Sequence, residues 1–219
     1  MDRTRKVIYL VFTGHEFADG GQVIRDVLRK NNIKASFFFT GDFYRTKSFS
    51  SLIEGLKADG HYLGPHSDKH LLYASWTNRD STLVDKSEFL SDLHANIEAI
   101  VGFGILPQNI KFFLPAFEWY NRQISDWTTT SGMQLVNFTP GTSSNADYTT
   151  PEMGSRYVSS DTIVERILSY EQSHADGLNG FLLLSHIGTA LERTDKFYNR
   201  LGDLLAELEK RGYTFRRLE

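Results

Sequence analysis

Residues 7 to 12 read Val-Ile-Tyr-Leu-Val-Phe, an unbroken run of aliphatic and aromatic side chains. Such a run predicts a strand that is buried on both faces, which is typical of a parallel sheet covered by helices. A second run of this kind, Phe181-Leu-Leu-Leu-Ser185, lies near the end of the chain. The two runs favour an α/β fold, in which the chemistry is found at the carboxyl ends of the strands.

The rest of the chain alternates between helical and strand periods. Helices are expected over 22–31, 51–59, 86–101, 122–130, 161–173 and 195–211. Strands are expected over 7–12, 34–40, 62–64, 111–114, 134–138, 181–185 and 213–218. Residues 140–159 are rich in Gly, Ser, Thr and Asn and predict a long loop. About seven such β/α units predict one domain, residues 1–219, built as a barrel.

Composition excludes several classes of function. The chain has 24 Lys and Arg residues against 27 Asp and Glu residues, a formal net charge of −3, which argues against a nucleic-acid or anionic-membrane partner. Cysteine is absent, so disulfides, thiolate catalysis and cysteine-based zinc sites are excluded, and any metal must be held by histidine and carboxylate.

The beginning of the chain carries no recognisable targeting signal. Residues 2–6 are charged or polar, and the apolar run of about eight residues that follows is too short for a signal peptide or a membrane span. We therefore expect a soluble protein, with the compartment and the oligomeric state left open.

The residues with the clearest chemistry are histidines. His66-Ser-Asp-Lys-His70 places two imidazoles four residues apart, and on one helical turn they would project from the same face and could bind one divalent ion. His186 directly follows the second apolar run, at the predicted carboxyl end of a parallel strand. A histidine pair at this spacing is also common without any metal, so the motif needs support from the rest of the chain.

The order of motifs supplies that support, because it resembles the polysaccharide deacetylase (NodB-homology) family, carbohydrate esterase family four. The resemblance is carried by Lys34-Ala-Ser-Phe-Phe-Phe39, His66-Ser-x-x-His70, Phe112-Phe-x-Pro115 and Leu183-Leu-x-His186. It implies a distorted (β/α) barrel of about seven strands that hydrolyses N- or O-acetyl groups on a carbohydrate. It also implies a divalent ion, usually zinc, bound by His66 and His70, with His186 as the general acid.

The first motif departs from the family pattern. Where the family has Thr-Phe-Asp-Asp-Gly, this chain has Phe12-Thr-Gly-His-Glu16, so His15 and Glu16 are the closest chemical substitutes. We expect His15 to act as base or base partner and Glu16 as the carboxylate ligand. The opposite assignment is also sound, because three histidines can bind zinc and a glutamate can activate water. Asp19 is a third candidate ligand, although an Asp before Gly at a helix start is typically an N-cap.

The third motif departs as well. Lys111-Phe-Phe-Leu-Pro-Ala-Phe-Glu118 lacks the arginine that orients the catalytic aspartate in the family. Losing the aspartate and its arginine together leaves no unpaired buried charge. The backbone N–H near Phe117 is expected to serve as an oxyanion donor, and Glu118, Trp119 and Tyr120 are expected to line the substrate pocket. The residue that tunes His186 is not identified by the sequence.

Two other functions fit these motifs. One is a metal-dependent hydrolase of small amides that are not sugars, and the other is a barrel that binds carbohydrate without catalysis. The altered first and third motifs favour them, whereas the presence of His66, His70 and His186 together favours a catalyst. Hydrolysis of carbon–nitrogen bonds other than peptide bonds is therefore the predicted enzyme class.

Overall fold

The computed structural model describes residues 5–219, which divide into two compact units. Among the described residues, the first unit contains residues 5–36, 58–62 and 138–219, and the second contains residues 37–57 and 63–137. Strands β2 (Ser36–Phe39) and β3 (Tyr62–Pro65) and helix α3 (Ser50–Ala58) each contribute residues to both units. The single domain predicted over residues 1–219 stays a prediction, and its first four residues lie outside the described part.

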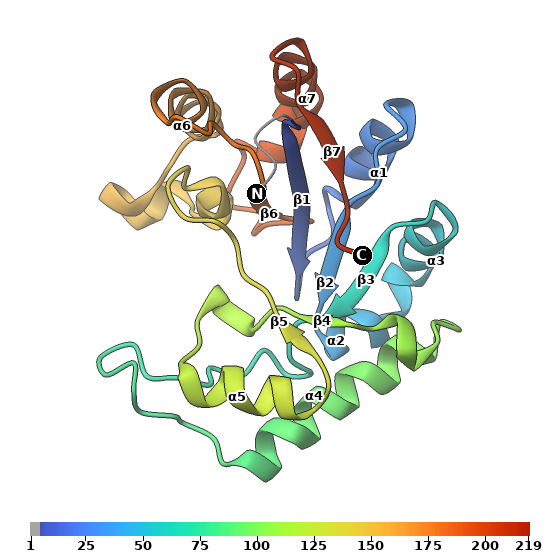
Figure 1. The fold of residues 1–219 in the computed structure, drawn as a ribbon. Helices are drawn as coiled ribbons and strands as arrows, with labels where there is room; N and C mark the ends of the chain where they lie inside the picture. The colour runs from blue at the N-terminus through green and yellow to red at the C-terminus, as the bar shows by residue number, and fades with distance from the viewer. Residues whose placement is uncertain (1–4) are drawn as a thin grey trace. The chain divides into compact units, whose positions relative to one another are not determined.

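The first unit is built around strand β1 (Val7–Gly14), which runs parallel to β6 (Phe181–His186) and to β7 (Thr214–Arg216), as Figure 1 shows. The apolar side chains of β1, among them Ile8, Leu10, Val11 and Phe12, are almost completely buried. The register pairs Thr13 with His186. Parallel pairing therefore brings His186 to the same edge of the sheet as the segment that follows β1.

Among the described residues, the helices that lie entirely in the first unit are α1 (Gly21–Lys30), α6 (Ser160–Ser173) and α7 (Leu201–Lys210). In α7 the buried residues are Leu201, Leu204, Leu205 and Leu208, the spacing of a core-facing stripe. The predicted helix over 195–211 begins later than expected, because a 3₁₀ turn, η6 (Phe197–Arg200), precedes it. Among residues 5–219, no helix is both long and apolar enough to cross a membrane.

The second unit contains α2 (Gly41–Arg45), α4 (Lys86–Val101) and α5 (Arg122–Thr130), with the short parallel strands β4 (Phe112–Phe113) and β5 (Gln134–Leu135). Both long helices have the predicted bounds because each begins at a strong cap. The Asp85 carboxylate accepts a hydrogen bond from the Glu88 N–H at 2.8 Å, and the Asn121 side chain accepts one from the Ile124 N–H at 3.1 Å.

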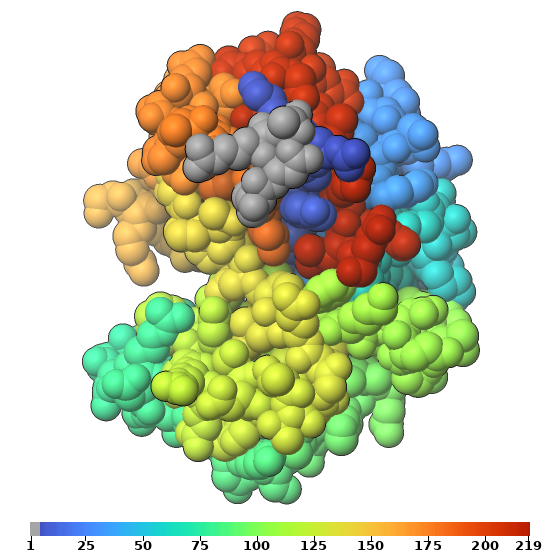
Figure 2. Space-filling model, viewed as in Figure 1, coloured from blue at the N-terminus to red at the C-terminus, as the bar shows by residue number. Residues whose placement is uncertain are grey.

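A loop around residues 73–85 packs against the start of α5. The Thr82 hydroxyl donates to the Gln123 side chain at 2.6 Å and accepts from the Asn121 amide at 2.7 Å. Figure 2 shows this loop, in teal, beside the yellow-green segment around residue 120. These contacts anchor the loop that carries Trp76.

The predicted loop over 140–159 is ordered by two 3₁₀ turns, η4 (Ser144–Tyr148) and η5 (Pro151–Arg156). Arg193, which is completely buried, holds this segment. Its guanidinium donates to the carbonyls of Thr149 (2.6 Å) and Val158 (3.1 Å) and to the Ser160 hydroxyl (3.2 Å). These acceptors, together with the Asp195 carboxylate 3.7 Å from the guanidinium, offset the cost of burying this charge.

We expect Arg193→Met to lower the free energy of unfolding by about 2–4 kcal/mol, because it leaves buried carbonyl groups without their donor. Urea unfolding followed by circular dichroism measures the change. Arg122→Met is the control, because Arg122 lies on the surface with its side chain 94% exposed, and its expected change is within about 0.5 kcal/mol. Equal losses in the two variants would contradict the role given to Arg193.

Candidate functional site

The His66–His70 motif is not a helical turn, so that part of the sequence prediction was wrong. Ser67 (φ 70°) and His70 (φ 55°) have left-handed backbone conformations. The backbone N–H groups of this segment donate to a side chain and not to helical carbonyl groups. The Asp92 carboxylate accepts from the N–H groups of Asp68 (2.9 Å) and Lys69 (3.1 Å). The two imidazoles nevertheless come together, with ring centroids 5.4 Å apart.

The middle of the motif has a structural role. Both Asp68 carboxylate oxygens accept hydrogen bonds from the Arg45 guanidinium, at 2.7 and 2.8 Å. Gly41 faces this carboxylate so closely that a Cβ atom there would lie 1.7 Å from the Asp68 Oδ1. The pairing of Asp68 with Arg45 holds the segment between the two histidines and engages the Asp68 oxygens.

His66 donates a hydrogen bond through Nδ1. This atom lies 2.8 Å from the backbone carbonyl oxygen of Leu114, which can only accept, so Nδ1 carries a proton. The His66 Nε2 lies 3.9 Å from the Glu118 Oε1, and both side chains are largely buried, at 3% and 11% exposure. A hydrogen bond of this kind is typical of a metal-ligating histidine.

The segment that carries Glu118 has an unusual backbone. Phe117 (φ 59°) and Glu118 (φ 53°) are consecutive residues in the left-handed region, which costs a side-chain-bearing residue about 1–2 kcal/mol. The Asn137 amide donates to the Glu118 carbonyl at 2.7 Å and stabilises this turn. Strained residues of this kind cluster at functional sites.

An aromatic patch formed by His70, Trp76, Phe117 and Trp119 lies next to the histidine motif. The Phe117 ring packs 4.3 Å from the His70 ring, and Trp76 stacks on Trp119 at 5.2 Å. Trp76 is 57% exposed and Phe117 is 41% exposed. Tyr120 lies beside this patch, since Arg79 contacts both the Trp119 and Tyr120 rings. The sequence pointed to Phe117, Trp119 and Tyr120 but not to Trp76, which lies in a loop.

The predicted proton donor, His186, is held by Asp147 in the first unit. The Asp147 Oδ1 lies 2.6 Å from the His186 Nδ1, and its Oδ2 accepts from the His186 backbone N–H at 2.8 Å. Asp147 is almost completely buried. Asp147 is the partner of His186 that the sequence did not identify, and the one available signal was an acidic residue within the predicted loop.

His15 and Glu16 follow the end of β1, in the same unit as His186. The His15 Nε2 lies 4.0 Å from the Glu16 Oε1, and the side chains are 31% and 68% exposed. Glu16 is thus the most solvent-accessible of the predicted site residues for which the structure gives a side-chain exposure.

Asp19 does not cap helix α1, whose N-cap position is held by Gly20, so the N-cap interpretation was wrong. Its carboxylate instead accepts hydrogen bonds from the Thr189 N–H, the Tyr198 hydroxyl and the Lys196 ammonium, at 2.8–2.9 Å. Burial alone would raise the pKa of Asp19, but these hydrogen bonds and the Lys196 charge outweigh it and lower the pKa. Asp19 therefore ties the segment after β1 to the segment after β6.

The donors in the second unit fit a zinc-like ion in type. Two imidazoles that bind one tetrahedral ion have ring centres about 5 Å apart, since each centre lies about 3 Å from the ion, and the observed 5.4 Å agrees. Within residues 5–219, no three His, Asp or Glu side chains already form a complete group that could hold an ion. The two imidazoles alone do not complete a metal site, and a third ligand would be needed.

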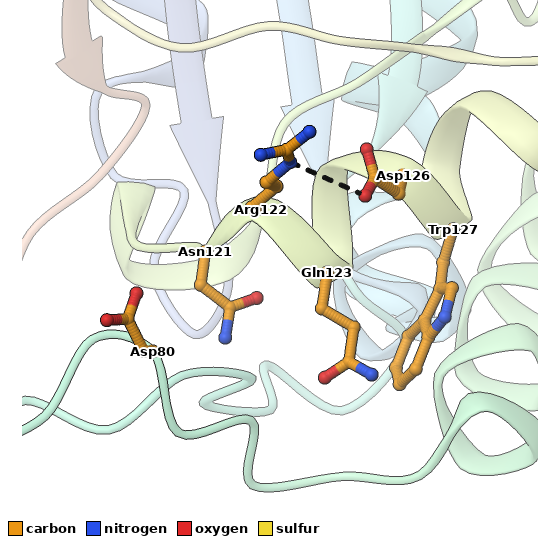
Figure 3. Close-up of a pocket in the computed structure, with 6 residues that line it drawn as sticks. All are labelled: Asp80, Asn121, Arg122, Gln123, Asp126 and Trp127. Carbon is orange, nitrogen blue, oxygen red and sulfur yellow. Dashed lines mark ion pairs between the residues drawn. The ribbon is translucent and has the colours of Figure 1, made fainter.

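A pocket of about 440 Å³ also lies in the second unit, at the start of α5 (Figure 3). Its lining residues are Asp80, Asn121, Arg122, Gln123, Asp126 and Trp127. None of them is a predicted site residue, and the Arg122 and Asp126 side chains form an exposed pair across one turn of the helix. We assign no chemistry to this pocket.

Residues 1–136 match the family model described as polysaccharide deacetylase. This match covers more than half of the 219 residues, so the chain belongs to the polysaccharide deacetylase family. The family includes hydrolases of carbon–nitrogen bonds other than peptide bonds, which is the enzyme class that the sequence predicts.

Individual relatives are more distant. An uncharacterised 30.6 kDa protein in the fumA 3′ region of Geobacillus stearothermophilus is 30% identical over 95 residues, which is 43% of this chain and 32% of that protein. The chain thus spans about a third of this curated relative.

Solved structures of low identity share the fold. BA3943 of Bacillus anthracis, described as a CE4 family pseudoenzyme, has a TM-score of 0.73 at 15% identity over 99% of this chain and 65% of its own. A BA3943 mutant described as having restored enzymatic activity gives the same TM-score at 16% identity, over 99% and 67%. PdaA of Bacillus subtilis, a family 4 carbohydrate esterase, gives 0.72 at 21% identity, over 99% and 80%. The predicted α/β fold, a distorted barrel of the NodB type, is confirmed.

Proposed function

We propose that this protein is a metal-dependent deacetylase that hydrolyses N- or O-acetyl groups on a carbohydrate. The observation that carries the proposal is the pairing of His186 with the buried Asp147 carboxylate. Burying a carboxylate costs desolvation free energy that its partners seldom more than offset, so the pairing indicates a purpose other than stability. General acid–base catalysis by His186 is such a purpose, and it favours a catalyst over a non-catalytic carbohydrate-binding barrel.

The contact with Asp147 defines which nitrogen of His186 can transfer a proton to the substrate. Because Nδ1 is hydrogen-bonded to Asp147, the other ring nitrogen, Nε2, is the atom that gives a proton to the leaving amine or alcohol. The Asp147 carboxylate stabilises the imidazolium form and holds the ring in one orientation. A histidine is appropriate because its ordinary pKa of about 6.5 lets it exchange protons near neutral pH.

His66 and His70 would hold the ion. When bound, a zinc-like ion polarises a carbonyl group and makes water a nucleophile near neutral pH. The backbone N–H near Phe117 is proposed to donate to the developing oxyanion. The exposed Trp76 and Phe117 rings of the aromatic patch are suited to stack against the apolar faces of sugar rings, and Trp119 stacks on Trp76.

We expect variants of the His15–Glu16 pair to separate base from ligand. A base can be removed without loss of the metal, and turnover then falls by roughly 10²–10⁴-fold, whereas loss of a ligand strips the metal. Elemental analysis and turnover of Glu16→Gln and His15→Ala distinguish the two roles. If both variants keep the metal and full activity, neither residue belongs to the site.

Acetate release tests the function itself. The zinc-loaded protein is incubated with acetylated oligosaccharides derived from chitin, peptidoglycan and xylan, with and without a chelator, and free acetate is measured. Release that the chelator abolishes supports the proposal. Cleavage of a simple cyclic amide without release from any sugar would instead favour the small-amide hydrolase. Binding of the sugars without turnover would favour the non-catalytic barrel.

A further inference from the structure

Helix α4 directs two polar side chains into the core beside the histidine motif. Asp92 is 7% exposed and Asn96 is completely buried, although the other buried positions of this helix, Phe89, Leu93 and Ile100, are apolar. Burying a polar side chain costs desolvation free energy, which its hydrogen bonds offset by a small margin at best. Because apolar residues would suit the same face of the helix, the hydrogen bonds of the two polar residues indicate their role.

Asp92 binds the chain on both sides of His70. Its carboxylate accepts from the N–H groups of Asp68 at 2.9 Å and Lys69 at 3.1 Å, and from the buried Tyr73 hydroxyl at 2.5 Å. Burial, the nearby Asp92 charge and this hydrogen bond raise the pKa of Tyr73 well above its usual value, so the phenol keeps its proton and remains a donor. One carboxylate therefore joins the residues that precede His70 to one that follows it.

Asn96 has the corresponding contacts at His66. Its Oδ1 accepts from the His66 N–H at 2.8 Å, and its Nδ2 donates to the Phe39 carbonyl at 3.2 Å. Phe39 is the last residue of β2, and His66 directly follows β3, which is the neighbour of β2 in the sheet. The Asn96 amide therefore joins the ends of two neighbouring strands at the point where the histidine motif begins.

The spacing of the two polar residues matches the spacing of the two imidazoles. Asp92 and Asn96 are four residues apart on one helix, where such side chains lie on the same face with Cβ atoms about 5–6 Å apart. The His66 and His70 rings have centroids 5.4 Å apart. The one-turn spacing that was predicted within the histidine motif is thus found on a helix that contacts the backbone beside both histidines.

We propose that Asp92 and Asn96 are positioning residues, which hold the backbone of the histidine motif so that the His66 and His70 imidazoles lie together. The use of these imidazoles rests on the proposed function, whereas their positioning is a property of the chain without metal. Neither positioning residue is proposed to touch substrate or an ion. A displacement of about 1 Å at a reacting group can lower the rate about 10²-fold, so the placement of two such groups has a large effect on turnover.

The test is heteronuclear NMR of the metal-free full chain labelled at histidine. In wild type, a nuclear Overhauser effect between the His66 and His70 rings is expected from their separation. Asp92→Asn, which keeps the shape and replaces one acceptor oxygen with a donor, is expected to weaken or abolish this effect, and so is Asn96→Ala. The His186 signals come from the other unit and are expected to be unchanged, which reports that the variants are folded.

Two further choices keep this test decisive. Glu98→Gln is the matched control, because Glu98 is exposed on the same helix, and all its histidine signals are expected to match those of wild type. Asn96→Ala decides the matter if Asp92→Asn does not fold. In Asn96→Ala the His66 N–H keeps an acceptor, the Phe39 carbonyl at 3.1 Å, so the backbone stays satisfied.

Zinc titration by calorimetry and acetate release give the functional readouts. Both variants are expected to bind zinc 10–100-fold more weakly than wild type, since the outer partners of metal ligands have effects of this size. The kcat on an acetylated oligosaccharide is expected to fall by roughly the same factor, with KM little changed because neither residue touches the substrate.

The outcomes separate this inference from the proposed function. If the Overhauser effect and the histidine signals are unchanged in the folded variants, the inference is overturned and the proposed function stands. If the variants lose the Overhauser effect while wild type neither binds zinc nor releases acetate, the positioning role is supported and the proposed function fails.

Discussion

Replacing His186 with alanine is expected to lower the turnover of N-acetyl substrates by roughly 10²–10⁴-fold while the bound ion is retained. An amine leaves poorly unless it is protonated, and His186 is the proposed donor. An activated ester, whose phenolate leaves without a proton, should lose much less. Steady-state rates on an acetylated oligosaccharide and on an aryl acetate, with metal content measured in the same preparations, check this expectation.

Asp147→Asn tests the mechanism of that effect, because an amide cannot stabilise the imidazolium as a carboxylate does. We expect turnover of the amide substrate to fall by about 10²-fold or more and turnover of the activated ester to fall much less. An equal loss on both substrate types in the His186 variant would mean that His186 positions the substrate rather than donating a proton.

Replacing His66 or His70 with alanine is expected to reduce the bound metal to background. Turnover is expected to fall to the level of wild type from which a chelator has removed the metal. Each variant removes one nitrogen ligand, and a site with one imidazole and one carboxylate binds zinc weakly. His94→Ala is the control, because His94 lies exposed on α4, in the same unit. Elemental analysis of protein that was never exposed to chelator measures the result, and unchanged metal in both site variants would remove the metal site from the proposal.

Local signals in the chain predicted most of the elements. Helices α4 and α5 have the predicted bounds because an apolar period and a strong N-cap, Asp85 or Asn121, mark each one within a few residues. Strands β1 and β6 were predictable because strands buried on both faces need continuous apolar sequence. Helix α2 was missed because its five residues are too few to establish a period.

The site was predictable to the extent that its residues belong to motifs. His66, His70 and His186 were recognised from their order along the chain. The conformation of the histidine motif was not, because the N–H groups of Asp68 and Lys69 donate to Asp92, more than twenty residues away. A local pattern does not reveal an acceptor that folding brings from another element.

By itself, the sequence determined the α/β class, the family, the absence of cysteine ligands and the three histidines on which the proposed chemistry depends. The tertiary structure alone decided which carboxylates face those histidines. Asp147 reaches His186 across 39 residues of sequence, and Glu118 reaches His66 across 52. Spacing along the chain reports only neighbours on one helix or strand, whereas a buried carboxylate is paired by the packing of separate elements, which no local period encodes.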